Sequence, residues 1–129
     1  MRVGIIGYWY ATNYGSACTY YALYKSIEKM GHTPIIIDMP EKEREFMWDT
    51  SFARKFVETH CMVSESVRWD EVEKLNNLCD AFRIGSDQVW NRDGFKISKG
   101  LFFLNFAKKQ GMTAYVSVCG SFCKQEHPA

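Results

Sequence analysis

Residues 2–38 read RVGIIGYWYATNYGSACTYYALYKSIEKMGHTPIIID, and their hydrophobic pattern decides the expected fold. Arg2–Gly7 is a short apolar run bounded by glycine, which is typical of a buried parallel strand. Between Ser16 and Met30 the apolar side chains recur at helical spacing; they are Tyr20, Leu23, Tyr24, Ile27 and Met30. Gly31 follows as a residue suited to end a helix. Thr33–Asp38 is β-branched and apolar, so this stretch predicts a strand, a helix and a second strand.

The remaining chain continues the alternation. Aromatic residues at four-residue spacing predict a helix over 51–60, and an apolar series predicts another over 68–79. Asp80–Gly85 and Met112–Val118 are the third and fourth expected strands, while Phe102–Phe106 is expected to be extended or a short helical turn. This order predicts an α/β fold: one domain over 1–129 with a Rossmann/flavodoxin-like parallel sheet and helices on both faces.

The order of the strands decides where a site would lie. If the order is 2-1-3-4, the first and third strands are neighbours at the topological switch point of the sheet. Ligands of open α/β sheets bind there, beyond the carboxyl ends of the strands. The loops that follow Gly7 and Gly85 are therefore expected to face one crevice.

The loop after the third strand carries an unusual set of side chains. Residues 85–91 read GSDQVWN, which places an acid, two amides, a hydroxyl and an indole together. Polar groups around a flat apolar surface suit a carbohydrate or another polyol. Two structural readings stay open, because an aspartate after a strand often caps a turn and a tryptophan can fill the core beneath a loop. The candidate residues are Ser86, Asp87, Gln88, Trp90 and Asn91.

The loop after the first strand supports the same interpretation. Residues 8–16 read YWYATNYGS, where a short polar connection would be usual. Trp9 or Tyr14 can stack on a sugar face, and Gly15 would let the backbone approach a ligand closely. Asn13 or Ser16 can instead cap the following helix, with the aromatic residues tucked into the core.

Taken in order, these motifs resemble the polysaccharide pyruvyl transferase family. The matching stretches cover nearly the whole chain; they are Gly7–Trp9, Asn13–Ser16, Tyr20–Leu23, Gly85–Asn91, Phe102–Phe106 and Thr113–Ser117. Family members are much longer than 129 residues. The resemblance therefore implies an N-terminal part of a larger, two-domain transferase of the GT-B type, acting in exopolysaccharide biosynthesis.

The resemblance also implies a reaction. Pyruvate would pass from phosphoenolpyruvate, the donor substrate, to a pair of hydroxyls on a sugar or lipid-linked oligosaccharide, forming a ketal. Asp87 would accept a hydroxyl proton or hydrogen-bond the sugar. The substrate-binding residues would be Trp9, Asn13, Tyr14, Gly15, Ser16, Ser86, Gln88, Trp90 and Asn91. Since both loops lack Arg, Lys and His, the groups that bind phosphoenolpyruvate are expected mainly in the second half, and this chain alone is expected to be inactive.

Composition narrows the alternatives. A net charge of +1 gives no reason to expect nucleic acid, and no apolar run approaches the length of a membrane span. The absence of a signal-peptide pattern favours the cytoplasm.

Five irregularly spaced cysteines indicate reduced thiols, with Cys18 expected to be buried, and we predict no metal site and no cofactor. Self-association or pairing with a C-terminal half is expected. A non-catalytic sugar-binding module and a nucleotide- or flavin-binding domain remain as alternatives.

Overall fold

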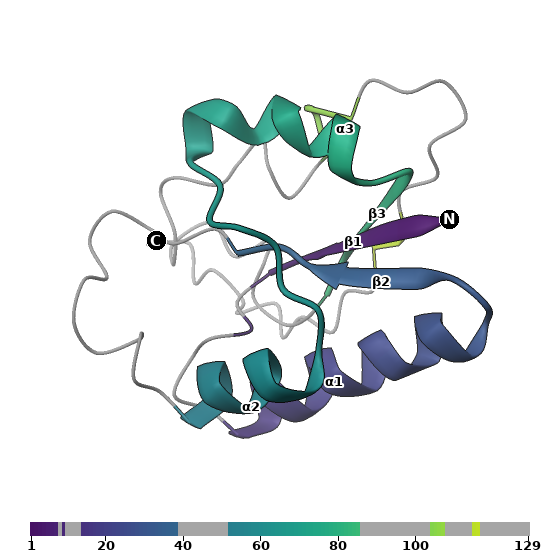
Figure 1. Ribbon diagram of the computed structural model, residues 1–129, viewed down its shortest axis with the longest axis vertical. Helices are drawn as coiled ribbons and strands as arrows, with labels where there is room; N and C mark the ends of the chain where they lie inside the picture. Colours follow the sequence, from purple (N-terminus) through teal and green to yellow (C-terminus); the bar gives the residue numbers. More distant parts are fainter. Residues whose placement is uncertain (8, 10–13, 39–51, 86–103, 108–114, 117–129) are drawn as a thin grey trace, which may run out of the picture.

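The computed structural model describes residues 1–7, 9, 14–38, 52–85, 104–107 and 115–116 (Figure 1). In chain order its elements are β1 (Arg2–Ile6), α1 (Tyr14–Lys29), β2 (Thr33–Ile36), α2 (Phe52–His60), the 3-10 helix η1 (Trp69–Lys74), α3 (Leu75–Leu78), β3 (Ala81–Ile84) and β4 (Tyr115–Val116). No helix among these residues has both the length and the apolar character needed to cross a membrane. The predicted alternation of strands and helices is confirmed over the described residues.

The sheet has the expected order. Its four strands run β2-β1-β3-β4, and every pair is parallel. β1 lies between β2 and β3, with Ile5 opposite Ile36 on one side and Ile6 opposite Ile84 on the other. Pro34 lies in the edge strand β2, which is where a sheet tolerates a residue that has no N–H to donate. The topological switch point therefore falls between β1 and β3.

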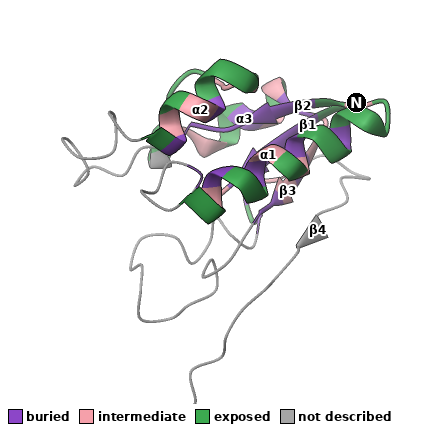
Figure 2. Cartoon of the chain, turned by 90° about the horizontal axis from the view of Figure 1, so that it is seen from below, coloured by how far each residue is buried: buried purple, intermediate pink, exposed green. Residues whose placement is uncertain are grey.

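Helices cover both faces of the sheet, with α1 and α2 on one side and α3 on the other (Figure 1). Figure 2 shows buried residues along the strands and exposed ones on the outer sides of the helices. The core on the α1–α2 side contains Val3, Ile5, Trp9, Tyr20, Tyr24, Ile27, Ile36 and Val57. The core on the α3 side contains Ile6, Ile35, Ile37, Leu75, Cys79, Phe82, Ile84, Leu104 and Phe106. The fold is a small, mixed α/β arrangement of the Rossmann-like kind.

Helix α1 begins earlier than the sequence predicts and ends where the sequence predicts. It starts at Tyr14, so Ser16 lies inside its first turn and the prediction of Ser16 as an N-cap is wrong. Gly31 has a φ of +85° and its N–H donates to Glu28 O, while His32 N–H donates to Ile27 O. These two bonds form a Schellman motif, which satisfies the last carbonyls of the helix. Met30 was expected in the core but is 60% exposed, because it lies beyond the last helical residue.

The two later helical segments are confirmed in position, with differences in detail. Helix α2 turns Ala53 and Val57 into the core, whereas Phe52, whose spacing indicated the helix, is 59% exposed. The segment expected as one helix over 68–79 is a 3-10 turn followed by the short α3.

The stretch expected as extended or a short helical turn is a turn at Leu104–Phe106. Leu104 has a φ of +55°, and Phe106 packs edge-on against Phe82 at 4.9 Å between ring centroids.

Candidate functional site

The candidate site lies at the carboxyl edge of β1 and β3. Gly7 follows β1 directly, Gly85 follows β3 directly, and Ile6 pairs with Ile84 immediately before them. The Gly85 N–H donates to Ile6 O at 3.0 Å, so the pairing continues to the point where both chains leave the sheet. The two motif segments therefore start from adjacent backbone, at the switch point where open α/β sheets bind ligands.

Tyr20 of α1 contacts the backbone at both points where the chain leaves the sheet, Gly7 after β1 and Gly85 after β3. Its side chain is 0% exposed, and its hydroxyl donates to Gly85 O at 2.6 Å. A Cβ on Gly7, whose φ is +156°, would lie 1.7 Å from Tyr20 Oη and 2.7 Å from Gly85 O. A Cβ on Gly85 would lie 2.8 Å from Tyr20 Cε1. Glycine is thus required at both positions because the phenol occupies the space of a side chain, a contact that the sequence pattern does not reveal.

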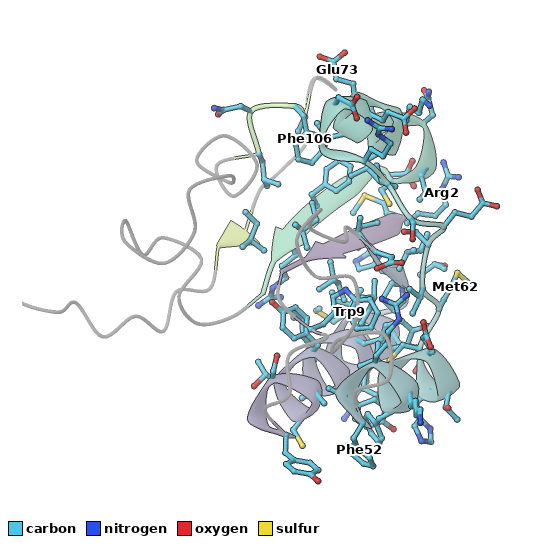
Figure 3. The ribbon with its side chains drawn as sticks, turned by 90° about the vertical axis from the view of Figure 1, so that its left-hand side faces the viewer. Arg2, Trp9, Phe52, Met62, Glu73 and Phe106 are labelled. Atoms are coloured by element: carbon cyan, nitrogen blue, oxygen red, sulfur yellow. The ribbon has the colours of Figure 1, made fainter. Side chains whose placement is uncertain are left out.

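Trp9 is a core residue rather than a sugar-binding surface. Its indole is 0% exposed, and its Nε1–H donates to Ile37 O at 3.0 Å. Figure 3 shows it between the sheet and the layer of α1 and α2. The prediction that Trp9 stacks on a sugar is wrong for this structure, because no face of the ring is open. The alternative, an aromatic residue tucked into the core, describes Trp9 correctly, and its N–H ties the loop after β1 to the end of β2.

The other predicted residues of the first loop lie at the start of α1. Tyr14 is the first residue of the helix and is 68% exposed, so its ring is open to a ligand. Gly15 is exposed and its carbonyl accepts a hydrogen bond from Thr19 Oγ1 at 2.8 Å, while Ser16 is half-buried. Chain order brings these three residues to the carboxyl edge of β1. Outside the described residues lie Asn13, Ser86, Asp87, Gln88, Trp90 and Asn91.

A buried ion pair at the end of β2 was missed by the sequence reasoning. Asp38 is 3% exposed, and its carboxylate accepts from both Nη atoms of Arg54, at 3.1 and 3.3 Å. Ser66 Oγ donates to the same carboxylate at 2.6 Å, and Arg54 Nε lies 2.9 Å from Glu58 Oε1. The guanidinium carbon of Arg54 is 5.4 Å from the centre of the Trp9 ring. This cluster joins α2 to the carboxyl edge of the sheet through charge-assisted bonds.

Arg83 is a second charged residue that sequence reasoning passed over, because it stood within an apolar run. It lies in β3 opposite Ile5, two residues before Gly85. Its Nε is buried and has no hydrogen-bond partner among the described residues.

The cysteines of the described residues are free thiols in different surroundings. Cys18 is exposed, so the prediction that it is buried is wrong; it lies on the outer side of α1. Cys79 is buried, and burial raises the pKa of the half-buried Cys61 thiol to about 11. No group of three or more His, Cys, Asp or Glu within the described part of the chain is placed to hold a metal ion.

The pKa of Cys61 leads to a test by alkylation. At pH 8 we expect iodoacetamide to modify Cys61 roughly 100-fold more slowly than an unperturbed thiol, since the thiolate fraction falls tenfold for each unit by which the pKa rises. The rate should keep increasing with pH until the pKa of about 11 is passed. Peptide mass mapping over time measures both cysteines, with exposed Cys18 as the internal control. Equal rates at pH 8 would contradict the burial of the Cys61 thiol.

Comparison with known proteins adds no assignment. The chain has no significant match among protein family models, curated proteins or solved structures.

Proposed function

We propose that this chain is the acceptor-binding part of a protein like the polysaccharide pyruvyl transferases, a cytoplasmic transferase of exopolysaccharide biosynthesis. Pyruvate would pass from phosphoenolpyruvate to two hydroxyls of a sugar as a ketal. One hydroxyl proton ends on the methylene carbon of the donor, both sugar oxygens bond to its central carbon, and phosphate leaves with the second proton. The chain would pair with a C-terminal half of GT-B type for this reaction.

The observation that carries the proposal is the junction of Gly7, Gly85 and Tyr20. The two stretches with the strongest resemblance to the family begin on either side of this junction, 78 positions apart in the sequence. The Tyr20 phenol holds Gly7 and Gly85 in fixed positions, which supports a preorganised site rather than two unrelated loops. Gly7 and Gly85, the described residues from which the two motif segments start, are thus held together at one edge of the sheet.

The charges at this edge support binding of the acceptor by this chain and of the donor, phosphoenolpyruvate, by the second half. Arg54, a cation at the same edge, is already bonded to Asp38 and Glu58. Phosphoenolpyruvate carries a phosphate and a carboxylate, which need cations that are free to bind them. The absence of basic residues from both motif loops leaves that role mainly to the second half.

The nucleotide-binding alternative is weakened by Asp38. Dinucleotide-binding Rossmann domains use an acid beyond the second strand to hold the ribose hydroxyls. Asp38 has that place in the chain, but Arg54 and Ser66 occupy its carboxylate and its side chain is 4% exposed. It is not available to a ribose in this structure.

The test is to record ¹H–¹⁵N correlation spectra of the labelled chain during separate titrations with galactosides, N-acetylhexosamines, phosphoenolpyruvate, nucleotides and flavins. We expect the sugars to shift the amides of Gly7 and Gly85, and phosphoenolpyruvate to have little effect on the chain alone. Shifts caused by nucleotides or flavins but by no sugar would overturn the proposal. Phosphate release from phosphoenolpyruvate by a longer protein containing this chain separates the transferase from a non-catalytic sugar-binding module.

A further inference from the structure

Trp9, two residues beyond Gly7, is held by two directed contacts. Its Nε1–H donates to Ile37 O at 3.0 Å, and the guanidinium carbon of Arg54 lies 5.4 Å from the centre of its ring. The second distance is within the range at which a guanidinium is attracted to the face of an indole. Because Trp9 is fully buried, water does not compete for either contact. The indole is therefore fixed relative to the end of β2 and to α2.

Arg54 is itself held in one orientation by carboxylates. Its two Nη atoms donate to separate oxygens of Asp38, at 3.1 and 3.3 Å, and its Nε lies 2.9 Å from Glu58 Oε1. Two parallel bonds to one carboxylate set the plane of the guanidinium, which the ammonium of a lysine cannot reproduce. The backbone of Asp38 is held in turn, since its N–H donates to Ser64 Oγ at 3.0 Å. The guanidinium thus meets the Trp9 ring with a defined geometry.

A buried ion pair of this kind defines geometry more than it adds stability. The Asp38 and Arg54 side chains are only 4% and 16% exposed, so both charges have lost most of their water. Their attraction repays that cost only in part, and apolar side chains of similar volume are often at least as stable. Apolar side chains, however, make no directed bonds, so they cannot orient a group against the indole as the guanidinium does. The pair is therefore suited to position Trp9.

Trp9 lies close to the edge of the sheet that carries the candidate site. Two residues span at most about 7 Å, so the Cα atom of Trp9 is no further than that from the Cα atom of Gly7. Tyr20 contacts Gly7 from α1, and Trp9 anchors the chain just beyond it. We propose that Arg54 is a positioning residue for this edge: through Trp9 it fixes the direction in which the chain leaves β1, and with it the fit of the acceptor sugar. This inference deepens the proposed function and rests on it for the identity of the ligand.

The test measures sugar affinity and the free energy of unfolding in the same variants. Asp38→Leu/Arg54→Met replaces both charges with apolar side chains, so it should be more stable than Arg54→Met but still bind sugar about tenfold more weakly than the unchanged chain. Arg54→Lys keeps a charge beside Asp38 without the two-bond contact, and should also bind about tenfold more weakly. Titrations with methyl β-galactoside and with N-acetylglucosamine, followed by ¹H–¹⁵N spectra, give the affinity of the folded chain. A role in stability alone would not separate the two measurements.

Arg68→Lys is the matched control, because it makes the same chemical change in an exposed ion pair. Arg68 Nε and Nη2 donate to the two carboxylate oxygens of Asp70, at 3.1 and 3.3 Å, and both side chains are 67% exposed. This variant should bind sugar within about twofold of the unchanged chain. The indole N–H signal of Trp9, identified by its loss in Trp9→Phe, should shift in Arg54→Lys and stay in place in Arg68→Lys.

Trp9→Phe also tests whether Arg54 acts through Trp9. Phenylalanine keeps a ring but loses the bond to Ile37 O, so it should weaken sugar binding by itself. Adding Arg54→Lys to Trp9→Phe should then weaken binding by less than about twofold more, because two residues that act as one unit are not additive.

The outcomes separate this inference from the proposed function. Sugar binding at full affinity in Arg54→Lys, or affinity that returns together with stability in Asp38→Leu/Arg54→Met, would overturn the positioning role and leave the proposed function standing. Additive effects of Arg54→Lys and Trp9→Phe would also overturn it, since Arg54 would then act independently of Trp9. Absence of any sugar effect on the unchanged chain would overturn the proposed function, and the positioning role with it.

Discussion

The Gly7→Ala variant is expected to lower the free energy of unfolding by about 4 kcal/mol, through overpacking and backbone strain together. The added methyl would lie 1.7 Å from Tyr20 Oη and 2.7 Å from Gly85 O, so at least one of them must move. Tyr20 is fully enclosed and bonded to Gly85 at 2.6 Å, which leaves it no open direction. The φ of +156° adds strain for any residue with a side chain. Urea unfolding followed by circular dichroism measures the loss.

Gly31→Ala is the matched control, because it separates backbone strain from contact. Gly31 also has a positive φ, +85°, but an added Cβ would meet nothing within 4 Å. Only the conformational penalty applies, which is about 1 kcal/mol. Equal losses in the two variants would mean that the close packing of Tyr20 against Gly7 contributes nothing. A Gly7→Ala/Tyr20→Phe double variant should be less unstable than the sum of its single variants, since it removes the closest atom.

The fold was largely predictable because its first half follows simple periodic patterns. Arg2–Ile6 and Thr33–Ile36 are continuous apolar runs, and α1 shows its buried face at helical spacing. A glycine at the end of that pattern placed the end of the helix correctly. The strand order 2-1-3-4 entered only as a condition, as one order that doubly wound sheets adopt, and the structure has that order.

The face that α2 turns to the core was not predictable from its aromatic spacing. Phe52, Phe56 and His60 recur every four residues, which fits a helix whichever side is buried. The structure buries Ala53 and Val57, while Phe56 is half-buried and packs against Tyr21 of α1. Periodicity thus identifies the helix but not the face that it turns to the core.

That the two motif segments start from one edge of the sheet was predictable, since β1 and β3 are neighbours there. The contacts that organise this edge were not predictable. The residues that organise this edge act over long sequence separations: Tyr20 bonds to Gly85, and Asp38 bonds to Arg54 and Ser66. Hydrophobic periodicity and short motifs do not reveal contacts between residues so far apart in the sequence. Trp9 was ambiguous for the same reason, since an indole in a loop suits a ligand surface and a core equally well.

Removal of the Arg54 charge is expected to have the second-largest effect. Arg54→Met keeps much of the side-chain volume but leaves Asp38 buried without its partner, which should lower the free energy of unfolding by about 3 kcal/mol. The carboxylate has 4% of its side chain exposed, so water cannot replace the guanidinium. Contact between the guanidinium and the Trp9 ring is lost as well, at 5.4 Å in the intact protein. Urea unfolding followed by circular dichroism measures the change.

Lys74→Met is the matched control for this charge. Lys74 pairs with Glu71 on the surface, with side-chain exposures of 70% and 39%, and exposed pairs contribute about 0.5 kcal/mol. Replacing Asp38 together with Arg54, by leucine and methionine, removes both buried charges, and it should restore part of the stability that Arg54→Met loses. An Arg54→Met loss no larger than that of Lys74→Met would show that Asp38 finds water or another donor. In that case the carboxyl end of β2 would be open, and the Asp38 carboxylate would be available to a ribose.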